Sequence, residues 1–160
     1  MSKARLKINW TIEDKNWKTL KFDPKKIGVA SIKKTLEYIE TIDSSVVEIS
    51  TLLSNDNKLQ ELNYNFRGKN KPTNVLSFPS GSPLQGEKHL YLGDIAISFQ
   101  TLYNESQEQQ KTFKDHYTHM LVHSILHLVG YDHERKKEAA LMENLEKTIL
   151  KSLNIKNPYE

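Results

Sequence analysis

The sequence contains no cysteine and no long apolar run, and both absences narrow the class of protein. Without cysteine there is no disulfide framework, and a cysteine-rich structural zinc site is excluded. A membrane-spanning helix needs about 18 or more consecutive apolar residues, and a secretion signal needs a basic start followed by an apolar segment. Neither pattern is present. The sequence therefore predicts a soluble, cytoplasmic protein that has no membrane partner.

An excess of one charge is also lacking. The chain has 23 basic and 20 acidic residues, which gives a formal net charge of +3. This total is too balanced to predict nucleic-acid binding, which must then depend on local clusters of charge. No internal repeat, low-complexity segment or long linker divides the chain, and its 160 residues are enough for one hydrophobic core. We therefore expect a single domain over residues 1–160.

Hydrophobic periodicity predicts a mixture of strands and helices. Strands are expected at residues 6–12, 46–53, 73–78 and 90–98. Helices are expected at 24–42, in a short segment that carries Leu59, Leu62 and Phe66, at 113–129 and at 136–153. Residues 79–89 are expected to form a mobile loop, and 101–110 a short polar helix or a loop. The pattern indicates an α+β or mixed α/β domain with one mixed sheet of about four strands covered by helices.

Three histidines between residues 123 and 133 have the spacing of a catalytic zinc site. Residues four apart on an α-helix lie on one face, so His123 and His127 can present two imidazole nitrogens to one point. Gly130 permits the left-handed conformation that ends a helix, after which His133 can return as a third ligand. One position of a tetrahedral ion stays open, as in catalytic sites. The sequence predicts one Zn²⁺ per chain, in a metalloprotease-like arrangement.

The alternative is that these histidines are ordinary polar positions of a helix. They are interleaved with aliphatic residues, namely Leu121, Val122, Ile125, Leu126, Leu128 and Val129. Burying several unpaired imidazoles among such side chains is costly, whereas one metal ion satisfies them together. His119 lies one turn before His123, and three roles stay open for it: support of the ligands, contact with substrate, or a place in the core. Imidazole also suits nickel, copper and iron.

A residue that zinc peptidases require is missing from the same segment. Peptidases with this histidine spacing carry a glutamate directly after the first histidine, and here that position is Ser124. The glutamate accepts and returns a proton during hydrolysis, which a serine hydroxyl cannot do near neutral pH. Peptide hydrolysis is therefore disfavoured. A substrate with a less demanding leaving group, such as a phosphodiester, does not need that base.

A short basic cluster precedes the third predicted strand. Arg67, Lys69 and Lys71 alternate with Gly68 and Asn70 in what we expect to be an exposed loop. Such a cluster can bind phosphate, although short clusters are also common in solvated turns. Arg67 is one of only three arginines beside 20 lysines. A guanidinium can contact two non-bridging phosphate oxygens at once, which favours a role in phosphodiester chemistry; a surface ion pair is the alternative.

Three blocks of sequence resemble the YbeY family of bacterial endoribonucleases, which mature ribosomal RNA. The first is the histidine segment 123–133 with its Gly-Tyr-Asp-His ending. The second runs through 61–63, 66–69 and 72–79, and the third is 92–98. All three occur in the order that the family shows. One departure is Ser124, where the family usually has glycine, and this concerns local packing more than the zinc site.

The resemblance implies a single-strand-specific, metal-dependent endoribonuclease that acts in 16S rRNA 3′-end maturation and in ribosome quality control. His123, His127 and His133 would hold the zinc, and Arg67 would be catalytic. The basic cluster and the position of His119 add the expectation that Lys69, Lys71 and His119 contact substrate. Partners would be ribosomal RNA, the small ribosomal subunit and assembly factors. Water and the ribose 2′-hydroxyl both stay open as the nucleophile. Two other functions are kept as alternatives: a zinc-dependent peptidase-like hydrolase, and a non-enzymatic ribosome-associated zinc protein.

Overall fold

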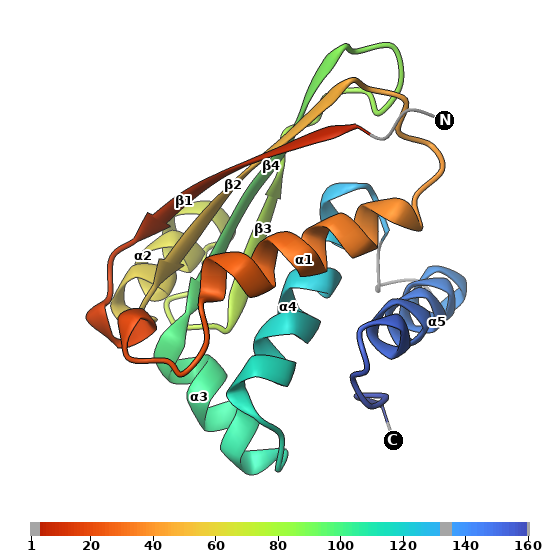
Figure 1. The fold of residues 1–160 in the computed structure, drawn as a ribbon. Coiled ribbons are helices and arrows are strands. Elements are labelled where there is room, and N and C mark those ends of the chain that lie inside the picture. The colour runs from red at the N-terminus through yellow and green to blue at the C-terminus, as the bar shows by residue number, and fades with distance from the viewer. Residues whose placement is uncertain (1–3, 132–135, 160) are drawn as a thin grey trace.

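The computed structural model describes residues 4–131 and 136–159, and within them the chain forms one mixed sheet with helices on both faces (Figure 1). The strands are β1 (Arg5–Ile12), β2 (Val46–Ser54), β3 (Val75–Pro79) and β4 (His89–Ser98). The α-helices are α1 (Pro24–Glu37), α2 (Asp56–Arg67), α3 (Phe99–Glu108), α4 (Phe113–Leu128) and α5 (Lys136–Ser152), with a 3-10 turn at Lys15–Lys18. The spatial order is β1-β2-β4-β3, with β3 antiparallel to β4 and the other pairs parallel. The predicted α+β fold with a mixed sheet is confirmed.

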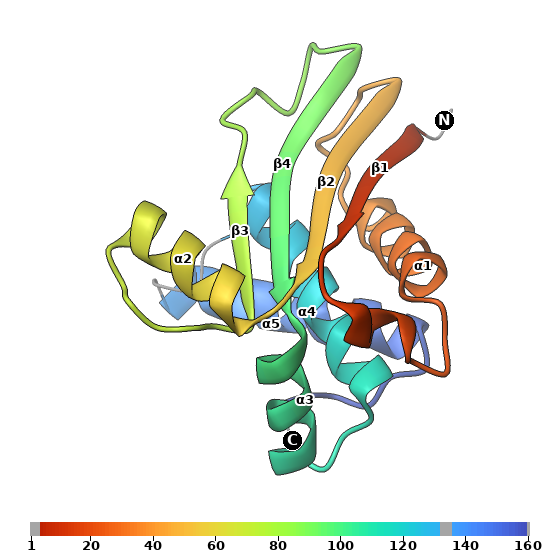
Figure 2. The same ribbon diagram turned by 90° about the vertical axis from the view of Figure 1, so that its left-hand side faces the viewer.

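The two faces of the sheet are covered by different helices. Figure 2 shows α2 in front of the sheet and α4 behind it. Successive side chains of a strand point to opposite faces of the sheet, so every second side chain faces α1 and α4. Ile8 on β1 and Ile95 on β4 are examples. Ala96, between two such residues, joins Leu59 of α2 and Leu76 of β3 in a separate cluster on the other face. The strand β3 lies at one edge of the sheet, and α2 and α4 lie on opposite faces of the sheet beside it. We call this edge the β3 margin.

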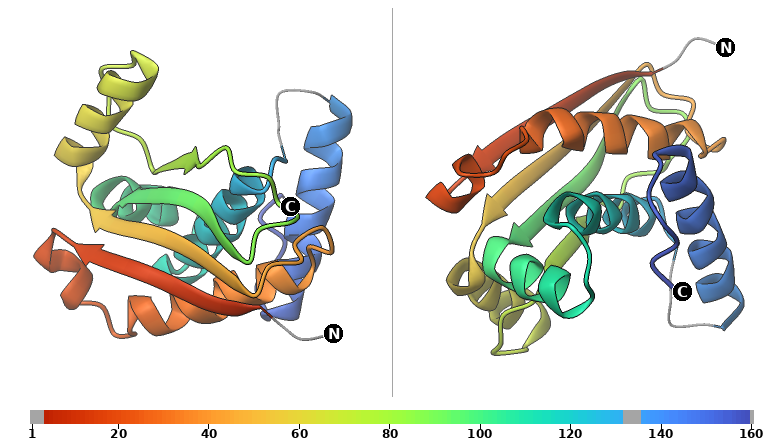
Figure 3. Two further views of the ribbon diagram at one scale, coloured as in Figure 1. Left: turned by 90° about the horizontal axis from the view of Figure 1, so that it is seen from above. Right: turned by 60° about the horizontal axis from the view of Figure 1, so that its bottom comes forward.

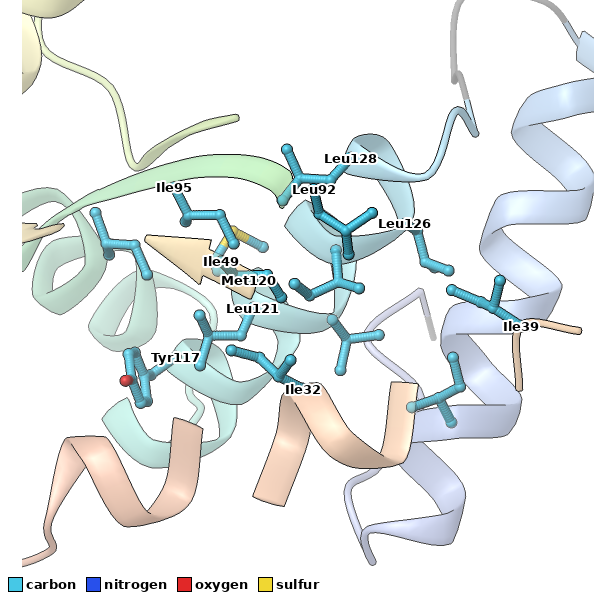
Figure 4. Packing of buried hydrophobic residues seen from close by; sticks show 14 of the residues in the cluster. Ile32, Ile39, Ile49, Leu92, Ile95, Tyr117, Met120, Leu121, Leu126 and Leu128 are labelled. Carbon is cyan, nitrogen blue, oxygen red and sulfur yellow. The ribbon is translucent and has the colours of Figure 1, made fainter. Parts of the chain in front are cut away.

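Helix α4 lies at the centre of the main core. A helix that is apolar all round must be buried on all sides, and most residues of α4 are buried. Figure 4 shows Leu121 of α4 among Ile32 of α1 and Ile49 of β2. Helix α5 packs on α4 and lies on the side away from α2 (Figures 1 and 3). The predicted histidine helix therefore has a rigid setting, and Gly130 follows it with a φ of +106°.

Three predicted elements differ from the structure by two residues or more at one boundary or both. Helix α1 ends at Glu37 and not at Ile42, because the backbone tightens at its end: the N–H of Ile39 donates to the carbonyl of Leu36 at 3.1 Å. This turn brings Ile39 back into the core. Strand β3 begins at Val75 rather than Thr73, and α3 is a regular helix that begins at Phe99, before the polar segment where a helix or loop was expected. None of the described helices is long and apolar enough to cross a membrane.

Candidate active site

His123 and His127 lie one turn apart on α4, and their rings converge. Their Nε2 atoms are 3.1 Å apart, and their ring centroids are 4.6 Å apart. Two nitrogens at about 2.0–2.1 Å from one tetrahedral zinc ion would be separated by about 3.3 Å. The pair therefore fits two adjacent positions around such an ion. Both side chains are partly exposed.

The third predicted ligand, His133, lies outside the described residues. Within residues 4–131 and 136–159, no group of three or more histidine, cysteine, aspartate or glutamate side chains is arranged to hold a metal ion. The two described histidines are only part of the set of protein ligands that a catalytic zinc ion needs. A complete zinc site thus stays a prediction that depends on His133.

A buried carboxylate lies behind the first histidine. Glu146 of α5 is 0% exposed, and one of its oxygens, Oε1, accepts a hydrogen bond from Nδ1 of His123. A carboxylate can only accept, so His123 carries its proton on Nδ1 and leaves the lone pair on Nε2. Metal-binding histidines commonly have this arrangement, because the carboxylate fixes the tautomer and the orientation of the ring. His123 therefore has the hydrogen-bonding arrangement that metal-binding histidines commonly have.

Three side chains donate to Glu146. Besides His123, the Nε2 of His119 donates to Oε2 at 3.2 Å, and the hydroxyl of Tyr159 donates to the same oxygen. Burial alone would raise the pKa of Glu146, but the hydrogen bonds from His119, His123 and Tyr159 hold it at about 2. Burial raises the pKa of Tyr159, and the hydrogen bond to Glu146 raises it further. Glu146 is therefore an anion near neutral pH, and the proton stays on Tyr159.

His119 is nearly buried, at 7% exposure, and faces Glu146 rather than solvent. Burial lowers the pKa of His119 more than Glu146 raises it, so the ring is neutral near pH 7. This placement favours support of His123 through the shared carboxylate over contact with substrate. Sequence reasoning did not single out Glu146. The available signal was its position among apolar residues of α5, between Met142 and Ile149.

Ser124 has a stability cost that can be tested. It is 0% exposed, and its hydroxyl has no hydrogen-bond partner among the described residues. An unsatisfied buried hydroxyl costs about 1–3 kcal/mol. We expect Ser124→Ala to raise the free energy of unfolding by about 1 kcal/mol, measured by urea denaturation. Ser31→Ala is the matched control, because the buried Ser31 hydroxyl donates to the carbonyl of Ile27 at 2.7 Å. Equal changes in the two variants would contradict the expectation.

Arg67 lies elsewhere in the fold. It is the last residue of α2, which Gly68 ends with a φ of +70°, so the expected loop position of Arg67 is wrong: the helix continues further than its pattern suggested. Lys69 and Lys71 follow in the connection to β3, where Asn63 anchors the backbone by accepting from the Lys69 N–H and donating to the Lys71 carbonyl. All three basic side chains are exposed.

The basic cluster and the histidine pair are on opposite faces of the sheet and share one edge strand. The ring of Phe66, next to Arg67, packs on that of Phe78 on β3, with the ring centroids 5.3 Å apart. Helix α4 packs on the other side of β3 (Figure 2). The structure thus brings His123 and His127 together but does not join Arg67 to them in one cluster. Substrate would have to cross the β3 margin to meet both.

A groove of about 430 Å³ lies between α2 and the sheet, on the face that carries the basic cluster. Phe66 and Phe78 form part of its wall, and Asn9, Ser50 and Asp94 add polar groups. Asp94 accepts a hydrogen bond from the hydroxyl of Tyr91 at 2.6 Å. The groove offers an aromatic surface and hydrogen-bonding groups close to the margin.

A family model and two relatives of this chain carry the same family name. A family model described as Endoribonuclease YbeY matches residues 10–154. A relative from Bartonella bacilliformis named Endoribonuclease YbeY is 44% identical over 158 residues, covering 96% of this chain and 97% of that protein. A relative of the same name from Rhizobium etli is 42% identical over 163 residues, covering 98% and 95%. The solution structure of TM1509 from Thermotoga maritima is 25% identical, with a TM-score of 0.54 and coverage of 92% and 91%.

Proposed function

Because the chain belongs to the YbeY family of endoribonucleases, we propose that it is a zinc-dependent, single-strand-specific endoribonuclease that matures the 3′ end of 16S rRNA. The observation that carries the metal chemistry is the convergence of His123 and His127, with Nε2 atoms 3.1 Å apart and Glu146 behind His123. We extend the proposal to a role in ribosome quality control in the cytoplasm, with ribosomal RNA, the small subunit and assembly factors as partners.

The residues have separate roles in this proposal. His123, His127 and His133 would hold the metal, which when bound supplies a Lewis acid at the scissile phosphate. Arg67 would pair its guanidinium with the non-bridging oxygens, where negative charge grows in the transition state. Lys69 and Lys71 would attract the phosphate backbone. An RNA strand lying across the β3 margin would reach both sets of residues.

The geometry weighs against a peptidase. The glutamate of zinc peptidases acts on the metal side of its neighbouring histidine. Glu146 contacts Nδ1 of His123, which is the nitrogen away from the point shared with His127. Ser124 holds the sequence position of that glutamate and is fully buried. Neither side chain can replace the peptidase base, which favours a substrate that needs no such group.

The aromatic pair near Arg67, in which Phe66 is exposed and Phe78 is half-buried, supports a preference for single strands. Phe66 is 68% exposed, and its ring packs against that of Phe78 beside the groove. Unpaired bases can stack on aromatic side chains, whereas bases in a duplex cannot leave their own stack without cost. We infer that one base of the substrate stacks at this pair.

The first experiment measures zinc content and RNA cleavage of the native protein, Arg67→Ala and Arg67→Lys. We expect about one zinc per chain in all three, and cleavage by Arg67→Ala reduced by about 100-fold or more, because one donor to transition-state charge is lost. Arg67→Lys should recover little, since lysine lacks the two-pronged geometry. Arg5→Ala is the control for an exposed arginine elsewhere. Equal cleavage by every variant would mean that the activity is a contaminant or does not use Arg67.

Phe66→Ala tests the base-stacking surface. Stacking of one base is worth about 1–3 kcal/mol, so KM for single-stranded RNA should rise by about 10-fold, while kcat and zinc content stay unchanged. Stability should change little, because the ring is mostly exposed. Tyr64→Ala, 58% exposed on the same helix, is the matched control and should behave like the native protein. The same KM in the two variants would exclude this surface.

A further inference from the structure

We propose that Glu146 is a positioning residue of the metal site and that Tyr159 fixes Glu146, so the segment after α5 belongs to the functional site. This inference rests on the proposed function, because it takes His123 to be a metal ligand. It adds two residues that the histidine motif does not contain. Both come from the last part of the chain, far in sequence from His123.

The contacts around Glu146 are made by three elements of the fold. His119 and His123 reach it from α4, Glu146 itself comes from α5, and Tyr159 comes from the segment that turns back beside α5 (Figure 3). The carboxylate is fully buried. A buried carboxylate is stable only when its oxygens accept enough hydrogen bonds, and here each oxygen has a donor. The three donors therefore fix the carboxylate in one orientation.

The orientation of Glu146 decides which nitrogen of His123 carries the proton. A neutral imidazole has two tautomers, and only the one with hydrogen on Nδ1 leaves a lone pair on Nε2. With Oε1 against Nδ1, the Nδ1–H tautomer is held. The other tautomer would point a hydrogen toward the position shared with Nε2 of His127, only 3.1 Å away. Glu146 therefore prepares His123 for a metal before the metal arrives.

Tyr159 has a defined place in this arrangement. Its hydroxyl donates to Oε2 of Glu146, and Nζ of Lys147 lies 5.9 Å from the centre of its ring. The rings of Tyr159 and His119 also lie nearly perpendicular to each other, with centroids 5.8 Å apart. These contacts hold the terminal segment against α4 and α5. Loss of the hydroxyl would leave Oε2 with His119 as its remaining described donor.

The test compares Glu146→Met, Glu146→Gln and Tyr159→Phe with the native protein. Zinc affinity is measured by competition with a chelator, and ¹⁵N NMR of the metal-free proteins reports the tautomer of His123. We expect Glu146→Met to weaken zinc binding by about 10–100-fold and to shift the His123 proton away from Nδ1. Glu146→Gln keeps one acceptor oxygen and should recover part of the affinity. Tyr159→Phe should have a smaller effect in the same direction.

A control separates positioning from stability. Ile149→Ala, at a fully buried position one turn further along α5, should destabilise the fold without changing the tautomer or the zinc affinity. If Glu146→Met binds zinc as tightly as Ile149→Ala and keeps the Nδ1–H tautomer, the inference is wrong. Should Glu146→Met fail to fold, Glu146→Gln and Tyr159→Phe decide by the same two measurements. If the native protein binds no zinc, the proposed function fails, while the tautomer of metal-free His123 still decides whether Glu146 positions the ring.

Discussion

Replacement of His127 by alanine is expected to abolish the proposed zinc binding and to lower RNA cleavage by at least about 1000-fold, or about 4 kcal/mol of transition-state stabilisation. The side chain supplies one of the two described nitrogens that converge on a shared point. With one ligand gone, the remaining donors cannot complete a tetrahedral catalytic site, which usually has three protein ligands. Zinc content by atomic absorption and cleavage of a single-stranded RNA measure both effects.

His89→Ala is the control for this experiment. His89 lies on β4, its side chain is 52% exposed, and it pairs with Glu48 on the sheet rather than with the α4 histidines. Its replacement should leave zinc content and cleavage unchanged. His133→Ala should reproduce the zinc loss of His127→Ala, which would complete the predicted ligand set. Retention of both zinc and cleavage in His127→Ala would show that the metal site lies elsewhere.

The local parts of the fold were predictable from the sequence. The strand at residues 6–12 and the helix at 113–129 have periods of two and of about 3.6 residues, and both occur within one residue of their expected bounds. The end of α1 was not predictable in this way, because Ile39 continues an apolar pattern although the backbone has already left the helix. The order β1-β2-β4-β3 is a long-range property, which no local pattern contains.

The same distinction between local patterns and long-range packing applies to the residues of the site. His123 and His127 are four residues apart on one helix, so helical geometry alone predicts that they converge. Glu146 reaches His123 only because α5 packs on α4, and Tyr159 reaches Glu146 only because the terminal segment turns back. The position of α2 across the sheet, which separates Arg67 from the histidines, likewise depends on packing. The histidines and Arg67 could be identified from the sequence, whereas Glu146, Tyr159 and the distances between residues of different elements could not.

Gly93→Ala is expected to lower the free energy of unfolding by about 3 kcal/mol or more, because it combines backbone strain with a steric clash. Gly93 has a φ of +145°, which residues with a side chain rarely adopt. An added methyl group would overlap the carbonyl oxygen of Phe78 on β3 and would lie 3.0 Å from Leu128 at the end of α4. Neither the strand backbone nor the packed helix can move without disturbing the sheet margin.

The position of Leu128 links this glycine to the proposed metal site. Leu128 follows His127 directly, so pushing it away from the sheet would displace the end of the histidine helix. We expect a fall in melting temperature of roughly 6–12 °C together with weaker zinc binding. Gly81→Ala separates the two causes, because Gly81 has a φ of +81° with no atom within 4 Å of an added methyl group. It should cost only about 1 kcal/mol, from strain alone, and leave zinc affinity unchanged. If both variants lost the same free energy of unfolding, the close approach of β3 and α4 to Gly93 would not contribute to the cost of the substitution.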